Sequence, residues 1–298
     1  MRSNRNQNSR CGRLRLLALF GLVAAGLLVF PQSAAAMGSP RTAAIQVGLK
    51  ARGLYAGTID GLWGPGTARG VRRLQWRSGL AVDGVVGPRT RLALGRLGRP
   101  LLGRRAMRQG LVGWDVSQLQ FMLAWHGFPS GTMDGAFGAR TDRALRRFQW
   151  FARLGVDGVA GPATLRALRS PLPTSPLPVS SPIPAPVGDR FGPRGSRFHT
   201  GLDYTAGYGA AVRAARSGRV RIAGWDNGGY GYFVVVRHGA GVYTWYAHLS
   251  RIAVSRGQHV SRGSRLGAVG ATGHAFGPHL HFEVRYRGAA TNPLTALR

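Results

Sequence analysis

The sequence predicts a multidomain α plus β protein with two small three-helix bundles, a proline-rich linker and a mostly antiparallel β domain. Three observations lead to this fold class. An internal repeat occupies much of the first 170 residues, seven prolines gather between residues 171 and 188, and short strand-like runs separated by glycine-rich turns follow Asp189. The length of 298 residues fits two or three modest domains better than one large core.

The first 36 residues have the pattern of a secretory signal peptide. Five arginines and no acidic residue precede residue 16, the run 16–30 is apolar, and Ala34, Ala35 and Ala36 supply small residues for cleavage. An uncleaved anchor is the alternative, although 15 apolar residues are short for a hydrocarbon layer of ~30 Å. We therefore expect a secreted protein, extracellular or associated with a cell wall, with no stable membrane span after cleavage.

Cysteine usage and charge restrict the partners. Cys11 lies before the apolar run, so a cleaved chain has no cysteine and no disulfide. Lys+Arg total 41 against 10 Asp+Glu, and removing the five leader arginines from the formal charge of +31 leaves +26. Such a chain is expected to bind polyanions. Its arginines are scattered, so no nucleic acid is expected, and peptidoglycan and anionic wall polymers are the favoured partners, although a basic nucleic-acid or polymer binder is a third interpretation.

The internal repeat has a period of 74 residues, and each copy contains a shorter period of 23. The pattern D-G-x-x-G-x-x-T occurs at 60–67, 83–90, 134–141 and 157–164. Asp-Gly predicts a turn in which glycine adopts a positive φ, and the final threonine is expected to cap the helix that follows. The two copies therefore predict one bundle of about three short helices over 37–110 and a second over 111–170.

Helix ends within the copies are predicted from their flanking residues. Gly79 and Gly155 are expected to end the helices that begin at Thr67 and Thr141. In the second copy, the spacing of Ser117 and Gln120 predicts a capping box for a helix that Gly127 ends.

These motifs, with the helix end Leu/Phe-Gln-Trp, resemble the peptidoglycan-binding-domain-like repeat family over about 43–93 and 117–167. The resemblance implies wall-anchoring bundles without catalytic chemistry. Two structural helical spacers are the alternative interpretation. Aromatic side chains of the repeats are candidates for contacts with sugar or peptide, but core packing is the favoured interpretation for them; they are Trp63, Trp76, Phe137 and Trp150.

The segment 171–188 reads PLPTSPLPVSSPIPAPVG. It is too rich in proline for a helix, so an extended polyproline-like tether is expected. At about 3.1 Å per residue, such a tether would hold the following domain up to roughly 55 Å from the repeats.

Seven of the eight histidines follow residue 188. In the run HLHFE, a strand places His279, His281 and Glu283 on one face. His199 and Asp203 are four residues apart, an even spacing that can direct both side chains toward one point. Neutral imidazoles and a carboxylate suit Zn²⁺, and three protein ligands with an open position are typical of a catalytic site.

The segments RFGPRGSRFHTGLDY, TWYAHLS and GPHLHFE strongly resemble the lysostaphin-type zinc metallo-endopeptidases of bacterial walls, and the domain expected from them spans 189–298. The resemblance implies that His199, Asp203 and His281 bind Zn²⁺. It further implies that His279 accepts a proton from the attacking water and that His248 stabilises the oxyanion. The run 275–277 departs from the Ser-Thr-Gly usual in the family, which removes two hydroxyls and no ligand.

The other polar residues of this domain have less specific interpretations. Glu283 is expected either to orient a metal ligand or to form a strand ion pair. His274 is expected to be a solvated loop residue, and His238 and His259 to be structural. Tyr246 lies two residues before His248, where packing is the ordinary role of a strand tyrosine.

The predicted function is that of a secreted zinc metallo-endopeptidase that binds peptidoglycan and hydrolyses peptide bonds in its stem or cross-bridge peptides. The alternative is a non-catalytic wall-bound regulator of another hydrolase, although such proteins are expected to lose metal ligands. The sequence sets no expectation for which peptide bond is cleaved or for the oligomeric state.

Overall fold

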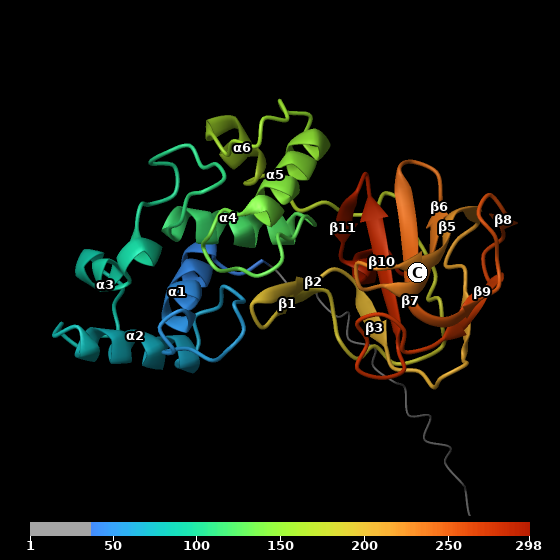
Figure 1. Ribbon diagram of the computed structural model, residues 1–298, viewed down its shortest axis with the longest axis horizontal. Coiled ribbons are helices and arrows are strands. Elements are labelled where there is room, and N and C mark those ends of the chain that lie inside the picture. Colours follow the sequence, from blue (N-terminus) through green and yellow to red (C-terminus); the bar gives the residue numbers. More distant parts are fainter. Residues whose placement is uncertain (1–36) are drawn as a thin grey trace, which may run out of the picture. The chain divides into compact units, whose positions relative to one another are not determined.

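The structure is a computed structural model that describes residues 37–298, so the signal peptide predicted over 1–36 lies outside the described residues. The described part has six α-helices followed by eleven strands, which confirms the predicted α plus β class (Figure 1). Within residues 37–298, no helix has the length and apolar character needed to cross a membrane.

Each copy of the repeat contains three α-helices, as predicted. The first copy has α1 (Pro40–Lys50), α2 (Pro65–Arg77) and α3 (Pro88–Ala93), followed by a short 3₁₀ turn at Gly95–Gly98. The second has α4 (Trp114–Trp125), α5 (Ala139–Phe151) and α6 (Pro162–Ala167). Helix α4 is buried all round, because one side packs on α1 and another on α5.

A buried glutamine holds each D-G-x-x-G-x-x-T loop, an arrangement that sequence reasoning missed. Gln46 Nε2 donates to Asp60 Oδ1 at 2.7 Å and to Thr67 Oγ1 at 3.3 Å, while its Oε1 accepts from the Gly61 N–H at 2.9 Å. The same clamp recurs in the other three loops, with Gln75, Gln120 and Gln149. The signal was present in the sequence, since these glutamines obey the 74-residue period in pairs.

The clamp explains why the predicted threonine caps are wrong. Thr67 and Thr141 lie inside α2 and α5, whose N-caps are Gly64 and Gly138. Each threonine hydroxyl accepts from the clamping glutamine, so it is occupied away from the helix terminus.

Two further predictions of helix ends are also wrong. Ser117 and Gln120 lie within α4, which begins at Trp114, because Gln120 is engaged by its loop. After α5 the left-handed position is taken by Arg153, at φ 58°, instead of Gly155. In contrast, Gly79 and Gly127 follow α2 and α4 with φ values of +63° and +86°, as predicted.

The segment 171–188 packs on the β domain, which corrects the expectation of a free tether. Val179 and Ile183 are buried in its core. The Val179 N–H donates to the Ala296 carbonyl at 2.9 Å, and the Gly188 N–H donates to the Asp203 carbonyl at 2.8 Å. Apolar side chains between the prolines thus find a core to fill, and burying them outweighs the tendency toward a solvated polyproline chain.

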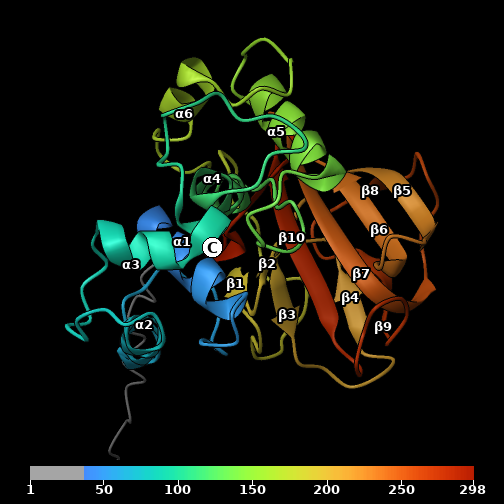
Figure 2. The ribbon, with the colours of Figure 1, turned by 60° about the vertical axis from the view of Figure 1, so that its left-hand side comes forward.

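The β domain is built on a nine-stranded sheet and a separate hairpin, and every strand pair is antiparallel. The main path of the sheet runs β11-β10-β7-β6-β5-β8, with β3 on β10 and β9 joining β4 to β7 (Figure 2). The strands are β1 (Gly192–Arg194), β2 (Arg197–His199), β3 (Leu202–Tyr204), β4 (Ala211–Arg213), β5 (Gly218–Asp226), β6 (Gly231–Arg237), β7 (Val242–Ile252), β8 (His259–Val260), β9 (Arg265–Val269), β10 (Leu280–Tyr286) and β11 (Ala289–Thr291).

Both repeats hold the tip of the β1–β2 hairpin through equivalent backbone groups. The Ile59 N–H donates to the Gly195 carbonyl at 2.8 Å. The Met133 N–H, from the residue 74 positions later, donates to the Ser196 carbonyl at 2.8 Å. The repeats therefore present the same loop amide to two adjacent carbonyls of the β domain.

Aromatic packing reinforces this contact. Trp125 of α4 meets Phe191 and Phe198 edge to face, with ring centroids 6.4 and 5.4 Å apart. Because β2 ends at His199, the backbone that the repeats hold leads directly to a predicted metal ligand.

Candidate metal centre

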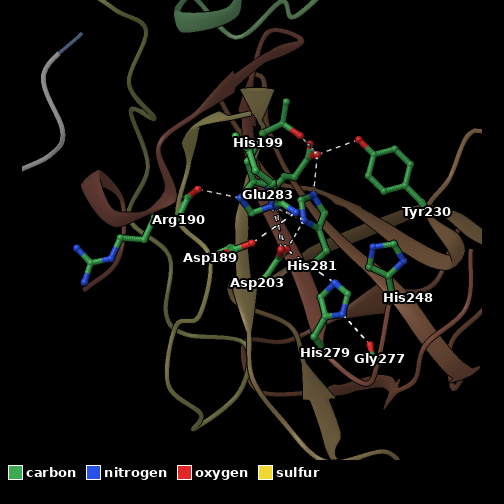
Figure 3. Close-up of polar contacts among 12 residues, drawn as sticks. Asp189, Arg190, His199, Asp203, Tyr230, His248, Gly277, His279, His281 and Glu283 are labelled. Atoms are coloured by element: carbon green, nitrogen blue, oxygen red, sulfur yellow. Dashed lines mark hydrogen bonds and ion pairs between the residues drawn. The ribbon is translucent and has the colours of Figure 1, made fainter. Parts of the chain in front are cut away.

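Three ligand atoms converge where β2, β3 and β10 meet. His199 Nε2 lies 3.0 Å from Asp203 Oδ1, and His281 Nδ1 lies 2.7 Å from the same oxygen (Figure 3). The two ring nitrogens are 3.0 Å apart. The register of β10 with β3 sets His281 opposite Asp203, so the sheet itself joins two residues that are distant in sequence. The structure thus brings together the three residues that the resemblance implies as ligands.

The outer nitrogen of each imidazole is held by an acceptor. His199 Nδ1–H donates to the Arg190 carbonyl at 2.8 Å, and His281 Nε2–H donates to Glu283 Oε1 at 3.0 Å. When both rings are neutral, their inner nitrogens face Asp203 with lone pairs. Two neutral imidazoles and one carboxylate are a donor set that Zn²⁺ accepts, and the metal would take the place of any proton held between them.

The electrostatics of the three residues favour positive charge between them. Burial alone would raise the pKa of Asp203, but the neighbouring imidazoles hold it well below its usual range. Burial alone would lower the pKa of His281, but Asp203 and Glu283 raise it to about 9. Without a metal, a proton supplies the positive charge between these side chains. A bound metal cation would supply it at the same position.

Glu283 is completely buried and holds the ring of His281, a candidate ligand, through its outer nitrogen. Its Oε1 also accepts from the hydroxyls of Thr200, at 2.5 Å, and Tyr230, at 2.8 Å, and its Oε2 accepts from Arg285 Nε at 2.5 Å. Burial would raise the pKa of Glu283, but Arg285 and His281 hold it well below its usual range. The ion pair expected from the sequence is therefore present, and the contact with His281 is the one that ligand orientation would need.

His248 and His279 stand side by side next to the three candidate ligands. Their ring centroids are 4.7 Å apart, and His279 Nε2 lies 3.9 Å from Asp203 Oδ1. His279 Nδ1–H donates to the Gly277 carbonyl at 2.9 Å, and His248 Nδ1–H donates to the Thr272 carbonyl at 2.7 Å. In this tautomer the Nε2 of each ring is free to accept a proton.

The backbone at His248 has a conformation that sequence reasoning did not predict. Its φ of 60° is left-handed, which is rare for a residue with a side chain. Such positions cost about 1–3 kcal/mol and cluster at functional sites. Burial also lowers the pKa of His248 to about 4, so the ring is neutral near pH 7.

A cleft of about 980 Å³ contains all five predicted site residues. One wall carries Arg194, whose guanidinium donates to Asp203 Oδ2 at 3.0 Å. The cleft is also lined by the loop that contains His274 and the fully exposed Phe276, where the sequence departs from the family pattern. Sequence reasoning missed Arg194 and also Tyr230, which reaches Glu283 across 53 positions of the chain.

Other residues considered from the sequence lie away from this chemistry. His238 Nε2 lies 2.8 Å from Thr244 Oγ1 in the interior, and burial lowers the pKa of His238. The Tyr246 hydroxyl is buried and accepts from the Ala215 N–H, while burial raises its pKa to about 12. His259 is exposed on β8. These placements agree with structural roles.

Two family matches cover most of the described chain. Residues 197–293 match "Peptidase family M23", and residues 38–94 and 113–168 match "Putative peptidoglycan binding domain". Both matches coincide with the regions that carry the resemblances found in the sequence.

Several curated proteins are similar to part of the chain. DD-carboxypeptidase/endopeptidase Mpg of Neisseria meningitidis is 44% identical over 115 residues, which are 38% of this chain and 26% of that protein. Peptidoglycan DD-endopeptidase ShyA of Vibrio cholerae is 41% identical over 112 residues, or 37% and 24% of the two chains. Lysostaphin of Staphylococcus staphylolyticus is 38% identical over 101 residues, or 34% and 20%. The chain thus spans about a quarter or less of the length of these relatives.

Among solved structures, a zinc-containing peptidase from Vibrio cholerae is 31% identical to this chain, covers 41% of each chain and has a TM-score of 0.38. The match of residues 197–293 to a peptidase family agrees with the predicted metallo-endopeptidase. Residues 197–293 form a domain of peptidase family M23, the lysostaphin-type family, and they follow two domains of the peptidoglycan-binding type.

Proposed function

We propose that the protein is a secreted zinc metallo-endopeptidase that binds peptidoglycan and hydrolyses peptide bonds in its stem or cross-bridge peptides. The observation that carries the proposal is the convergence of three lone-pair donors, on His199, Asp203 and His281, in an open cleft beside two further histidines. The leader pattern over 1–36 and the two peptidoglycan-binding domains support a location at the wall.

The donor set supports Zn²⁺ as the cofactor. His199 Nε2, Asp203 Oδ1 and His281 Nδ1 would hold Zn²⁺, and the carbonyl of Arg190 and the carboxylate of Glu283 fix the two rings. When bound, Zn²⁺ polarises the scissile carbonyl and lowers the pKa of a bound water toward ~7.

The remaining steps belong to side chains of this chain. His279 accepts the proton of the attacking water at Nε2, because its Nδ1–H is held by the Gly277 carbonyl. It then returns that proton to the leaving amine. His248 stabilises the developing oxyanion as an imidazolium. Its Nε2 takes a proton from solvent in the open cleft as negative charge forms beside it, since a nearby anion raises the pKa of an imidazole.

Digestion of purified cross-linked peptidoglycan tests the proposal. Residues 37–298, loaded with one equivalent of Zn²⁺, are expected to release peptide fragments that mass spectrometry identifies, while a His281→Ala variant binds the wall and releases none. The fragments also name the bond that is cut. If the zinc-loaded protein binds several wall types and cleaves none of them, the regulator interpretation replaces this one.

A further inference from the structure

A second pocket, of about 350 Å³, lies between α5 and the turn that joins β10 to β11. Phe128, Trp150 and Val156 supply its apolar lining, and the guanidinium groups of Arg146, Arg147 and Arg287 surround them. None of these residues lines the metal cleft. The pocket is also shared, because Arg287 and Gly288 come from the M23 domain and the other five lining residues come from the second repeat.

Trp150 is the exposed aromatic surface of this pocket. Its side chain is 60% exposed, whereas Phe128 beside it is buried. The Arg287 guanidinium lies 6.0 Å from the centroid of the Trp150 ring and 5.7 Å from that of Phe151. An arginine placed over aromatic rings still presents N–H groups at its edge, where a carboxylate can bind in a bidentate manner.

The three arginines differ in their partners. Arg146 Nε is paired with Asp142 Oδ2 at 2.9 Å, and Arg147 donates to the Gly288 carbonyl at 3.3 Å. Arg287 has neither an acidic partner nor a side-chain hydrogen bond among residues 37–298. The pocket therefore combines an exposed ring, an apolar lining and one guanidinium available to an anion.

Charge complementarity and pocket size select the occupant. A ligand that satisfies Arg287 needs an anionic group such as a carboxylate, and one that covers Trp150 and Val156 needs an apolar or ring-shaped face next to it. A volume of about 350 Å³ accommodates a short peptide rather than a folded partner. Peptidoglycan stem peptides, which carry free carboxylates beside small apolar side chains, have this chemistry.

We propose that this pocket, formed by Trp150 of the second repeat and Arg287 of the M23 domain, binds a carboxylate-bearing stem peptide of peptidoglycan. The inference rests on the proposed function, since it takes the same polymer as ligand. Arg287 lies in the turn after β10, six positions beyond His281, and the pocket shares no lining residue with the metal cleft.

The first repeat supplies a matched control. Trp76 occupies the position 74 residues before Trp150 and is 73% exposed. No arginine lies over the Trp76 ring within the described part of the chain. The two tryptophans thus share their helix position and exposure but differ in the guanidinium contributed by the M23 domain.

Calorimetric titration of the full chain with two peptides tests the proposal. One is a synthetic stem tetrapeptide with free carboxylates, and the other is the same peptide with these groups amidated. Arg287→Gln and Trp150→Ala are each expected to weaken binding of the free acid at least fivefold, while Trp76→Ala leaves it unchanged. The amidated peptide is expected to bind weakly and to be insensitive to Arg287→Gln.

Several results would overturn the proposal. One is that the Arg287→Gln variant binds the free-acid peptide as tightly as the wild type does. Another is that Trp76→Ala and Trp150→Ala weaken its binding equally. The third is that a polyglycerol phosphate displaces the peptides in a manner that depends on Arg287, which would assign the pocket to a phosphate polymer. Arg287→Lys keeps the positive charge but not the planar guanidinium, so its affinity for the free-acid peptide should lie between those of the wild type and Arg287→Gln. This variant checks that the weaker binding of Arg287→Gln is not caused by misfolding. The binding assay does not depend on catalysis. If the protein cleaves no peptidoglycan but binds the peptide in a manner that depends on Arg287, the proposed peptidase activity is refuted and the binding proposal stands.

Discussion

The two repeats share one sequence motif and one fold, yet they have different neighbours. Both hold their loops with buried glutamines, and both donate a loop amide to the β1–β2 hairpin, through Ile59 in one copy and Met133 in the other. The second copy also packs on the β10–β11 hairpin, where Phe151 meets Tyr286 edge to face at 6.3 Å. Internal contacts follow the repeated motif, whereas docking follows the residues in which the copies differ.

One pair of equivalent glycines illustrates this difference in docking, because a Cβ atom added to each would meet different surroundings. Gly53 and Gly127 occupy corresponding positions after α1 and α4, with φ values of +68° and +86°. A Cβ on Gly53 would meet nothing within 4 Å, but one on Gly127 would lie 2.2 Å from the Ala290 carbonyl oxygen. In the second repeat this position therefore serves both the turn and the contact with β11.

The largest expected effect comes from replacing these glycines. Gly127→Ala should destabilise the second repeat by about 3 kcal/mol, because a left-handed alanine costs ~1–2 kcal/mol and overlap with β11 adds a similar amount. Gly53→Ala should cost only about 1 kcal/mol. Hydrogen exchange of each repeat, followed by mass spectrometry, measures both. Equal losses in the two variants would show that docking on β11 adds nothing.

Removing the glutamine clamp should affect the copies equally. Gln46→Ala and Gln120→Ala each leave the buried N–H of Gly61 or Gly135 without its acceptor, at a cost of about 2 kcal/mol. Local exchange rates of the two loops again provide the measurement. If one variant were much more damaging than the other, the clamp would depend on its surroundings and not on the motif alone.

A change behind the metal centre should leave both repeats unaffected. Glu283→Gln removes the charge that fixes the ring of His281, so zinc affinity should fall about 10- to 100-fold. Competition with a chelator measures that affinity, and exchange rates in 37–170 serve as the control. Unaltered zinc affinity would remove Glu283 from the site.

The smallest effect is a pH dependence confined to the second repeat. His126 is buried, with Nε2 3.0 Å from the Leu168 carbonyl, and burial lowers its pKa below 6.5. The unfolded chain then binds the proton first, so this contribution to stability is present above pH 6.5 and is lost as pH falls toward the lowered value. The loss cannot exceed about 1.4 kcal/mol per pH unit.

Urea unfolding at pH 7 and pH 5 measures this loss, and His126→Gln should reduce it. The first repeat has Arg52 at the corresponding position, so its exchange rates should not show the same dependence. An identical pH response in wild type and His126→Gln would assign the proton uptake to other groups.

Local patterns in the sequence predicted the fold class and the residues of the candidate site. The 74-residue period predicts two like bundles, because a repeated motif repeats its own internal contacts. The alternation in HLHFE places His281 and Glu283 on one face of β10, as the structure shows. The resemblance then connected them with His199, Asp203 and His248, and all of them line or support one cleft.

Tertiary structure decided the contacts between distant residues, which local sequence patterns do not contain. Thr67 is engaged by Gln46, the proline-rich segment fills a core, and Tyr230 reaches Glu283, each through contacts between residues far apart in the chain. The pocket at Trp150 likewise exists only because Arg287, 137 positions later, packs beside it. Periodicity reports which face of an element is apolar, but it does not report which other element covers that face, and this pairing determines caps, docking and electrostatics.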